Sequence, residues 1–334
     1  MSRLNRIAPW ISLAIVAAFC ARVYCHKLIP VIPTVSASAL AAQQPAPQPP
    51  DQGPDPAAVN QAPAGPSYTT EAPPPPDQQG NPAAEPEDSN YADQPVANTA
   101  DAPPPLPEYV QPPCPGDGYM WEPGYWASSP QGYYWVPGAW VESPYTGALW
   151  TPGYWGFYTG RYWFHPGHWG LHIGYYGGIN YGFGYIGVGY EGGYWNAGHF
   201  TYNRFYNNIN DRRVHNAYRY DAGNRAAAGR DAYNRESPNR ENNNSRASFH
   251  GGTGGTQFRP QASEAAAWRE PTAARMNTQV QHEQRFQSNR GQFANTNHGQ
   301  PARPSISRPI QADRNVKPTT RNQSHGAQPQ QHQR

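Results

Sequence analysis

A short motif, W-x-P-G-x-W, recurs along one stretch of this chain and constrains its fold more than any other feature. Successive copies begin 13 to 15 residues apart between positions 119 and 169. Two further copies depart from the pattern, since the fourth has one extra residue and the fifth, at 195–200, lacks the proline. The tryptophans, prolines and glycines of the first four copies are Trp121, Pro123, Gly124, Trp126, Trp135, Pro137, Gly138, Trp140, Trp150, Pro152, Gly153, Trp155, Trp163, Pro166, Gly167 and Trp169.

The length of the repeat indicates its fold class. The period is too short for a propeller blade or a pair of helices, but it accommodates two short strands and two turns. Pro-Gly suits one turn, because proline presets φ and glycine accepts a positive φ at the next position. The second turn is expected at 129–132, 144–147 and 157–160, where each loop ends in glycine. The motif therefore predicts a small all-β fold, an antiparallel meander of hairpins flanked by long disordered segments.

The tryptophans of each copy are expected to face each other across the strands that its Pro-Gly turn joins. The expected pairs are Trp121 with Trp126, Trp135 with Trp140, Trp150 with Trp155 and, because of the extra residue, Phe164 with Trp169. A four-residue loop is an equal alternative, since L-Pro-Gly favours a type II turn whose twist suits a two-residue hairpin poorly. The aromatic face is expected to form the core. An exposed platform that stacks on sugar rings is the second interpretation.

This spacing resembles that of bacterial proteins with YXWGXW repeats, also written WXXGXW. The segments 119–126 and 134–140 carry the resemblance. The downstream segments 246–255 and 297–302 also look like longer members, so the resemblance extends over roughly 115–305. It implies an exported protein of the cell envelope, of a family without an assigned biochemical role.

The first 42 residues have the pattern of an export signal. Arg3 and Arg6 precede an apolar run over 7–19, and small residues at 37–42 offer cleavage sites. An uncleaved membrane anchor is the alternative, although Arg22 interrupts the run, whose length is at the lower limit for a bilayer. We therefore expect export to the periplasm, the outer surface or the medium.

The flanks of the repeats are rich in residues that disfavour a packed core. The chain contains 39 Pro and 33 Gly, a composition typical of extensive disorder around a small ordered part. Residues 43–112 are predicted to be a disordered, proline-rich acidic linker, and 206–334 a disordered basic tail. The repeats occupy 113–172, and the Gly/Tyr-rich stretch 173–205 is expected to extend their sheet, a self-associating loop being the alternative.

One helix is predicted inside the basic tail. Thr272 follows a proline and can cap a helical run over 273–287. Met276 and Val280 share a face of this helix, and that apolar stripe is too narrow to dock strongly.

Charge is segregated along the chain. Residues 28–160 contain 13 Asp and Glu and no Lys or Arg, whereas residues 200–334 contain 20 Lys and Arg against 9 Asp and Glu. An arginine-rich tail suits carboxylate and phosphate groups. The predicted partner is a polysaccharide or other envelope polyanion, with self-association through the acidic front as an alternative. Nucleic acid is not expected, and contact with a membrane is expected only through an uncleaved N-terminus.

The sequence predicts no catalytic, cofactor-binding or metal-binding site. It contains no nucleophile elbow, zinc-protease motif, P-loop or paired cysteines. The acids within the repeats, Glu122 and Glu142, lie near turns and are expected to be solvated. The sequence thus favours a structural or surface-interaction protein without enzymatic activity, the alternative being a glycan-binding module that uses the Trp and Tyr faces.

Two other groups of side chains in the sequence are candidate sites. Cys114 is the one cysteine outside the signal, and we expect a buried, unreactive thiol, with intermolecular pairing as the alternative. His165, His168 and His172 lie around the fourth Pro-Gly, with His199 further along, but this is a weak signal for a metal.

Overall fold

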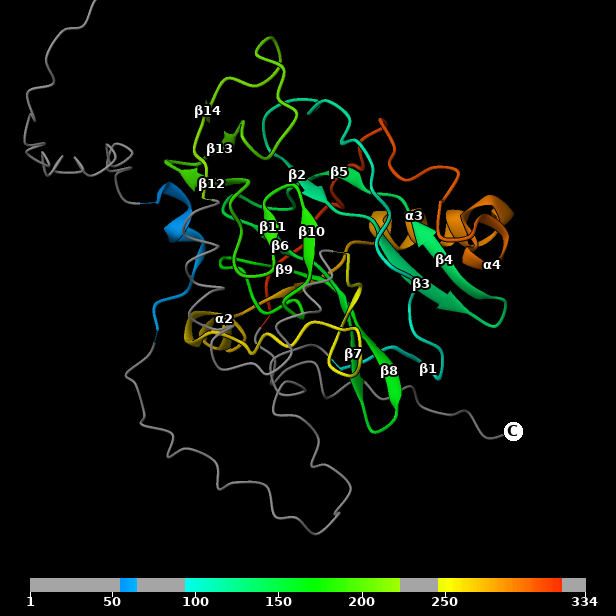
Figure 1. Cartoon of the computed structure of the whole chain (residues 1–334). Helices are drawn as coiled ribbons and strands as arrows, with labels where there is room; N and C mark the ends of the chain where they lie inside the picture. The colour runs from blue at the N-terminus through cyan, green and yellow to red at the C-terminus, as the bar shows by residue number, and fades with distance from the viewer. Residues whose placement is uncertain (1–54, 65–93, 223–245, 320–334) are drawn as a thin grey trace, which may run out of the picture. The chain divides into compact units, whose positions relative to one another are not determined.

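The computed structural model describes residues 55–64, 94–222 and 246–319 (Figure 1). The expected export signal over 1–42 lies outside the described residues, as do 43–54 and 65–93 of the linker and 223–245 and 320–334 of the tail. The described residues form mostly short strands in small sheets, mainly antiparallel, with few helices. The prediction of a small all-β fold is confirmed.

The first two repeats form one long β-hairpin, here called hairpin 1 (residues 119–142). At its tip, β3 (Tyr125–Ser129) and β4 (Gly132–Val136) pair around a two-residue loop. At its base, β2 (Tyr119–Glu122) and β5 (Ala139–Glu142) pair in the same register. The Pro-Gly of one copy therefore lies opposite the Pro-Gly of the other, and each strand bends there without reversing.

Hairpin 2 (residues 149–170) repeats this construction with the third and fourth copies. Its tip is β7 (Tyr154–Tyr158) paired with β8 (Arg161–His165), and its base is β6 (Leu149–Thr151) paired with β9 (His168–Gly170). The loop residues Thr159 and Gly160 have φ of 51° and 74°. Two successive positive φ values define the type I′ turn that matches the twist of a hairpin.

The prediction that Pro-Gly reverses the chain is wrong for these four copies. The reversals fall at 129–132 and 158–161, and residues 143–148 connect the two hairpins. The four Pro-Gly glycines do not have a positive φ. Proline holds its φ near −65°, which excludes the type I′ turn seen at Thr159 and Gly160, although the reversal at 129–132 accommodates Pro130 without a positive φ at either loop residue.

The fifth copy shows what happens when the proline is missing. Its strands β12 (Gly193–Asn196) and β13 (His199–Asn203) pair around Ala197 and Gly198, whose φ values are 46° and 81°. Trp195 then faces Phe200 across the ladder, with ring centroids 5.5 Å apart. The proline-free copy is thus a tight hairpin, and the proline-containing copies are bends.

In the four proline-containing copies the aromatic pairs consequently form between copies and not within them, which corrects the expected pairing. The ring-centroid distances are 5.4 Å for Trp121 and Trp140, 5.2 Å for Trp126 and Trp135, 5.1 Å for Trp150 and Trp169, and 5.1 Å for Trp155 and Phe164. Most of these rings are tilted or edge-to-face, the geometry that the aromatic quadrupole favours.

The glycine at the same place in each of the four copies has a steric cause. A methyl group on Gly138 would lie 2.6 Å from Cζ2 of Trp121, and one on Gly124 would overlap the Trp135 ring. A methyl group on Gly167 would meet the Trp150 ring in the same way, whereas one on Gly153 would lie 2.7 Å from the His165 carbonyl oxygen and 3.0 Å from the Phe164 ring. Three of the four glycines are therefore covered by the first tryptophan of the copy that pairs with them, the fourth faces the backbone of its partner strand, and only glycine permits these approaches.

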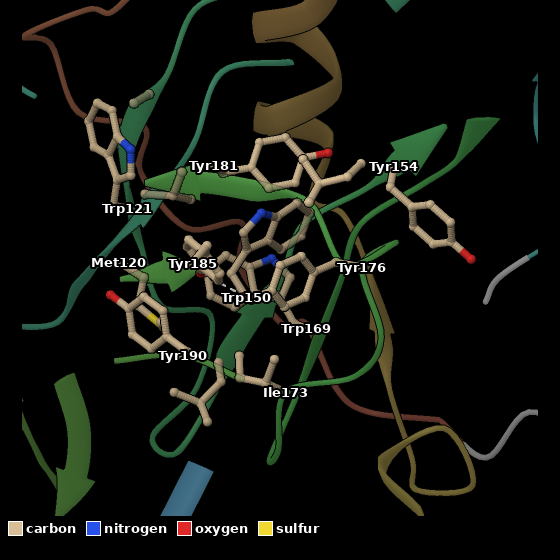
Figure 2. Close-up of a cluster of buried hydrophobic side chains, with 14 of the residues drawn as sticks. Met120, Trp121, Trp150, Tyr154, Trp169, Ile173, Tyr176, Tyr181, Tyr185 and Tyr190 are labelled. Carbon is tan, nitrogen blue, oxygen red and sulfur yellow. Dashed lines mark hydrogen bonds between the residues drawn. The ribbon is translucent and has the colours of Figure 1, made fainter. Parts of the chain in front are cut away.

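The Gly/Tyr-rich stretch does not extend the repeat sheet. Its strands β10 (Asn180–Gly182) and β11 (Tyr185–Ile186) form a sheet of their own. Its tyrosines instead pack on hairpin 2, around Trp150 and Trp169 (Figure 2). The Tyr185 hydroxyl donates to the Trp150 carbonyl at 2.7 Å, and the Tyr181 hydroxyl donates to that of Gly153 at 2.6 Å.

Segments predicted to be disordered complete the sheets. From the linker, β1 (Ala97–Thr99) pairs with β8; from the tail, β14 (Ala217–Tyr218) pairs with β13, β15 (Phe249–His250) with β7, and β16 (Ala273–Ala274) with β9. The prediction of disorder is therefore wrong for 94–112 and for most of 206–222 and 246–319, because these segments find hydrogen-bonding partners on the hairpins.

The helices are short and lie mostly in the tail. They are α2 (Ala262–Ala267), α3 (Asn277–Gln287), α4 (Ala294–Asn297) and the 3-10 helices η1 (Pro56–Asn60) and η3 (Arg290–Gln292). The predicted helix over 273–287 is α3, which starts at Asn277 because Ala273 and Ala274 form β16. Among the described residues no helix combines the length and apolarity needed to cross a membrane.

The contact between Gly138 and Trp121 predicts how a substitution changes stability. Replacing Gly138 by Ala forces the methyl group against the Trp121 ring, and we expect a loss of about 1–3 kcal/mol in the free energy of unfolding. Gly116→Ala is the matched control, since its nearest new contact is at 3.7 Å. Urea unfolding followed by tryptophan fluorescence measures both. Equal midpoints for the two variants would contradict the close-approach explanation.

Candidate functional site

The repeat tryptophans form the core of the molecule. Seven of them, Trp121, Trp126, Trp135, Trp140, Trp150, Trp155 and Trp169, are at most 3% exposed. The eighth, Trp163, is only half-buried, because Phe164 takes its place in the ladder opposite Trp155. Trp163 lies one residue out of register and stacks on Tyr158 at 5.6 Å. The core interpretation of the aromatic face is confirmed, whereas a stacking platform made of the seven buried rings is not what the structure describes.

Burial gives each indole N–H a need for an acceptor. In hairpin 1, three of these groups donate to main-chain carbonyls of prolines in the flanking segments. Trp126 Nε1 donates to the Pro105 carbonyl at 3.2 Å, Trp140 Nε1 to that of Pro112 at 2.8 Å, and Trp135 Nε1 to that of Pro304 at 2.9 Å. Extended, proline-rich chain has no internal hydrogen bonds, so its carbonyls are available. We call this set of three contacts the indole–carbonyl clamp.

The linker is further held by Tyr109. Its hydroxyl accepts a hydrogen bond from the Gly124 amide at 2.9 Å, and its ring lies edge-on to Trp135 at 5.9 Å. The neighbouring Leu106 amide donates to the Arg246 carbonyl at 2.9 Å. The linker therefore lies between hairpin 1 and the tail, bonded to both.

The tail adds a strand-like segment to the edge of hairpin 1. This segment, here called the C-terminal strap (residues 303–313), runs parallel to β5. The Gly138 amide donates to the Pro304 carbonyl at 3.1 Å and the Ile306 amide donates to the Gly138 carbonyl at 2.9 Å. Further along, the Ile310 amide donates to the Trp140 carbonyl at 2.8 Å. These bonds cover the edge of β5, which would otherwise expose unpaired backbone groups.

Helix α3 docks through polar side chains. Its buried residues are Gln279, His282 and Phe286, three and four positions apart. Gln279 Oε1 accepts the indole N–H of Trp169 at 2.9 Å, and His282 lies 2.8 Å from the Pro137 carbonyl. This buried face has two polar side chains among its three members, so an apolar stripe does not reveal it. The need of Trp169 for an acceptor was the signal that could have revealed it.

The same helix buries a carboxylate of the first repeat. Glu122 was expected to be solvated, but it is 7% exposed and accepts a hydrogen bond from Gln279 Nε2 at 3.0 Å. Burial raises the Glu122 pKa to about 7, and the hydrogen bond from Gln279 limits the rise. Glu142, the second acid of the repeats, accepts from the Ala312 amide of the strap at 3.1 Å. Both acids therefore hold tail segments in place.

An ion pair lies beside Glu122. Arg275 pairs with Glu283 of α3, and the hydroxyls of Tyr125 and Tyr134 each donate to Glu283 at 3.2 Å. The cavity next to Glu122 has a volume of about 10 Å³. That volume is at the limit for a single water molecule, so this cluster offers no room for a substrate.

Cys114 and the histidines occupy structural positions. The Cys114 side chain is fully buried, its thiol donates to the Gly116 carbonyl at 3.2 Å, and burial raises its pKa to about 12. The expectation of a buried thiol is confirmed. His165 and His168 are buried, and His172 pairs with Glu270 at 2.7 Å. Over the described ranges, no three His, Cys, Asp or Glu side chains come together as a metal site would require.

Hairpin 1 and hairpin 2 define a protein built from paired aromatic repeats, in which the two repeats of a pair form the two arms of one hairpin. A family model of the WXXGXW repeat matches residues 116–141 in two copies. This segment is therefore a pair of WXXGXW repeats, as the resemblance implied. The match coincides with hairpin 1, so its two copies are the two arms of one hairpin. No curated protein and no solved structure matches the chain.

The clamp predicts a difference between two equally buried tryptophans. Trp135→Phe removes the donor to Pro304, whereas the Nε1 of Trp121 has no hydrogen-bond partner among the described residues. Both substitutions remove a similar ring area, so Trp135→Phe should lower the free energy of unfolding by about 1 kcal/mol more than Trp121→Phe. Urea unfolding measures the difference, and limited proteolysis should show earlier cleavage in the strap of the Trp135 variant. Equal losses would mean that the clamp contributes nothing.

The buried Glu122 predicts a pH-dependent stability. Its folded pKa lies above the ordinary value of 4.5, so the folded chain holds the proton more tightly and stability falls as pH rises from 4.5 towards 7. The isosteric Glu122→Gln variant lacks this loss, and it should match the wild type at pH 4.5 and be more stable at pH 8. Each pH unit within the window contributes at most about 1.4 kcal/mol. Thermal unfolding of both proteins from pH 4.5 to 8 measures this, and parallel profiles would contradict it.

Proposed function

We propose that this chain is an exported, non-catalytic protein of the cell envelope, with a structural or surface-interaction role. The indole–carbonyl clamp is the observation that carries the proposal. The tryptophans that define the repeats donate hydrogen bonds to the chain's own linker and tail. Glu122 and Glu142 accept hydrogen bonds from the tail. The repeats thus form a scaffold that orders extended, proline-containing segments.

The sequence supports the location. A positive start, an apolar run and small residues at 37–42 are typical of exported chains. The expected signal is followed by proline-rich sequence, which is common between an export signal and a folded part. The periplasm, the outer surface and the medium are the compartments consistent with this pattern.

The alternative, a glycan-binding module that uses the faces of the repeat aromatics, has less support. Stacking on a sugar ring requires an exposed aromatic face, and seven of the eight repeat tryptophans are at most 3% exposed. Trp163, which stacks on Tyr158, and Trp195 of the fifth copy are half-buried and are the repeat tryptophans that remain for such a role.

Cell fractionation combined with N-terminal sequencing tests the proposal. We expect the chain in an envelope or secreted fraction with a new N-terminus close to residues 40–43, as the small residues at 37–42 indicate. A matched variant in which the apolar run over 7–19 carries two aspartates should remain in the cytosol. A wild-type chain that starts at residue 1 and stays in the cytosol would overturn the proposal.

A further inference from the structure

A groove between α3 and the C-terminal strap is left unused by the scaffold. Its volume is about 1020 Å³, at the upper end of the range for ligand pockets. One wall is α3, which Figure 1 shows beside β4, and the other is the strap. The lining residues are Thr278, Gln281, His282, Arg285 and Phe286 on the helix, and Arg303 with residues 305–311 on the strap.

The groove is positively charged. Arg285, Arg303 and Arg308 line it, their residues are exposed, and none of them forms a salt bridge within the described parts of the chain. No Asp or Glu is among the described lining residues. Three unneutralised guanidinium groups in one concave site attract an anion, and their planar donors suit carboxylate or phosphate oxygens.

The nearby titratable groups are already engaged. Glu283 of α3 pairs with Arg275, and the Asp313 carboxylate accepts the amides of Asn277 and Thr278 at the start of α3. His282 lies against the Pro137 carbonyl, and burial lowers its pKa, so its ring is neutral at neutral pH. The charge of the groove therefore comes from the three arginines.

The remaining lining favours a sugar polymer over a nucleic acid. Phe286 is only 4% exposed, and the other apolar lining residues, such as Ile306, are aliphatic, so the groove presents no aromatic face on which bases or sugar rings could stack, and a ligand is held there by charge and hydrogen bonds. Exposed Gln281 and Ser307 add an amide and a hydroxyl that suit sugar hydroxyl groups. The walls thus combine cationic donors with neutral hydrogen-bonding groups.

We propose that this groove binds an acidic polysaccharide, with carboxylates of its sugar rings held by Arg285, Arg303 and Arg308. The inference rests on the proposed envelope function and specifies its partner by chemistry. The sequence alone predicts that the whole basic tail attracts a polyanion. The groove instead places the binding at a defined site on a folded part of that tail.

Binding of labelled polygalacturonate to the full chain tests the proposal, with neutral dextran as the reference polymer. The test variant carries Arg285→Gln, Arg303→Gln and Arg308→Gln. The matched control carries Arg212→Gln, Arg213→Gln and Arg269→Gln, which are exposed, lie outside the groove and remove the same charge. We expect the groove variant to lose about tenfold or more in affinity and the control to stay within about twofold. Dextran should not bind.

Three results would overturn the proposal. Equal losses in the two triple variants would indicate attraction by net charge alone. Dextran binding as tightly as polygalacturonate would remove the role of the carboxylates, and single-stranded DNA displacing polygalacturonate at lower concentration would favour a nucleic acid. The single variant Arg285→Gln, on the exposed face of α3, gives a second reading, with an expected loss of about two- to threefold and an unchanged unfolding midpoint. Cell fractionation tests the proposed function separately from the groove. An exported chain that does not bind polygalacturonate would overturn only the proposal for the groove, and a chain that stays in the cytosol would overturn only the proposed envelope function.

Discussion

The hydrogen bond from a buried indole N–H to a proline carbonyl is the interaction on which the described structure depends. Aromatic repeats alone would leave a ribbon whose tryptophans have apolar rings to bury and polar N–H groups to satisfy. Proline-rich segments have the opposite need, because their carbonyls lack partners within an extended chain. Each bond contributes only about 0.5–1.5 kcal/mol, but an unsatisfied buried donor costs about 1–3 kcal/mol. Three such bonds and the backbone pairs around Gly138 make the flanks part of the fold.

The proline-glycine step explains why two repeats, and not one, form the structural unit. Proline prevents the type I′ turn, and glycine makes room for the ring of the partner copy. Gly124 is covered by Trp135 and Gly138 by Trp121, so neither copy is complete without the other. The family match over 116–141 has the same two-copy length. The fifth copy, with Ala197 in place of the proline, closes on itself as a hairpin.

The sequence was sufficient to predict the fold class, the position of the repeats, the buried core and the burial of Cys114. It did not predict which turn reverses the chain, because Pro-Gly is compatible with both a turn and a bend. The choice depends on the contact between Gly124 and Trp135, which is made across the hairpin. The order in 94–112 and 246–319 was missed for a related reason. The composition of a segment indicates how much apolar area it can bury. These segments are also held by hydrogen bonds to the hairpins, which composition does not reveal.

Native-state hydrogen exchange measured by NMR on the full chain tests the central claim most directly. The amides of Ile306 and Ile310 donate to carbonyls of hairpin 1. If the flanks belong to the fold, these amides should exchange with the same free energy of opening as those of β4 and β5, and they should shift together when denaturant is added. Exchange of the strap amides at the rate of an unstructured chain, while hairpin 1 stays protected, would contradict the account.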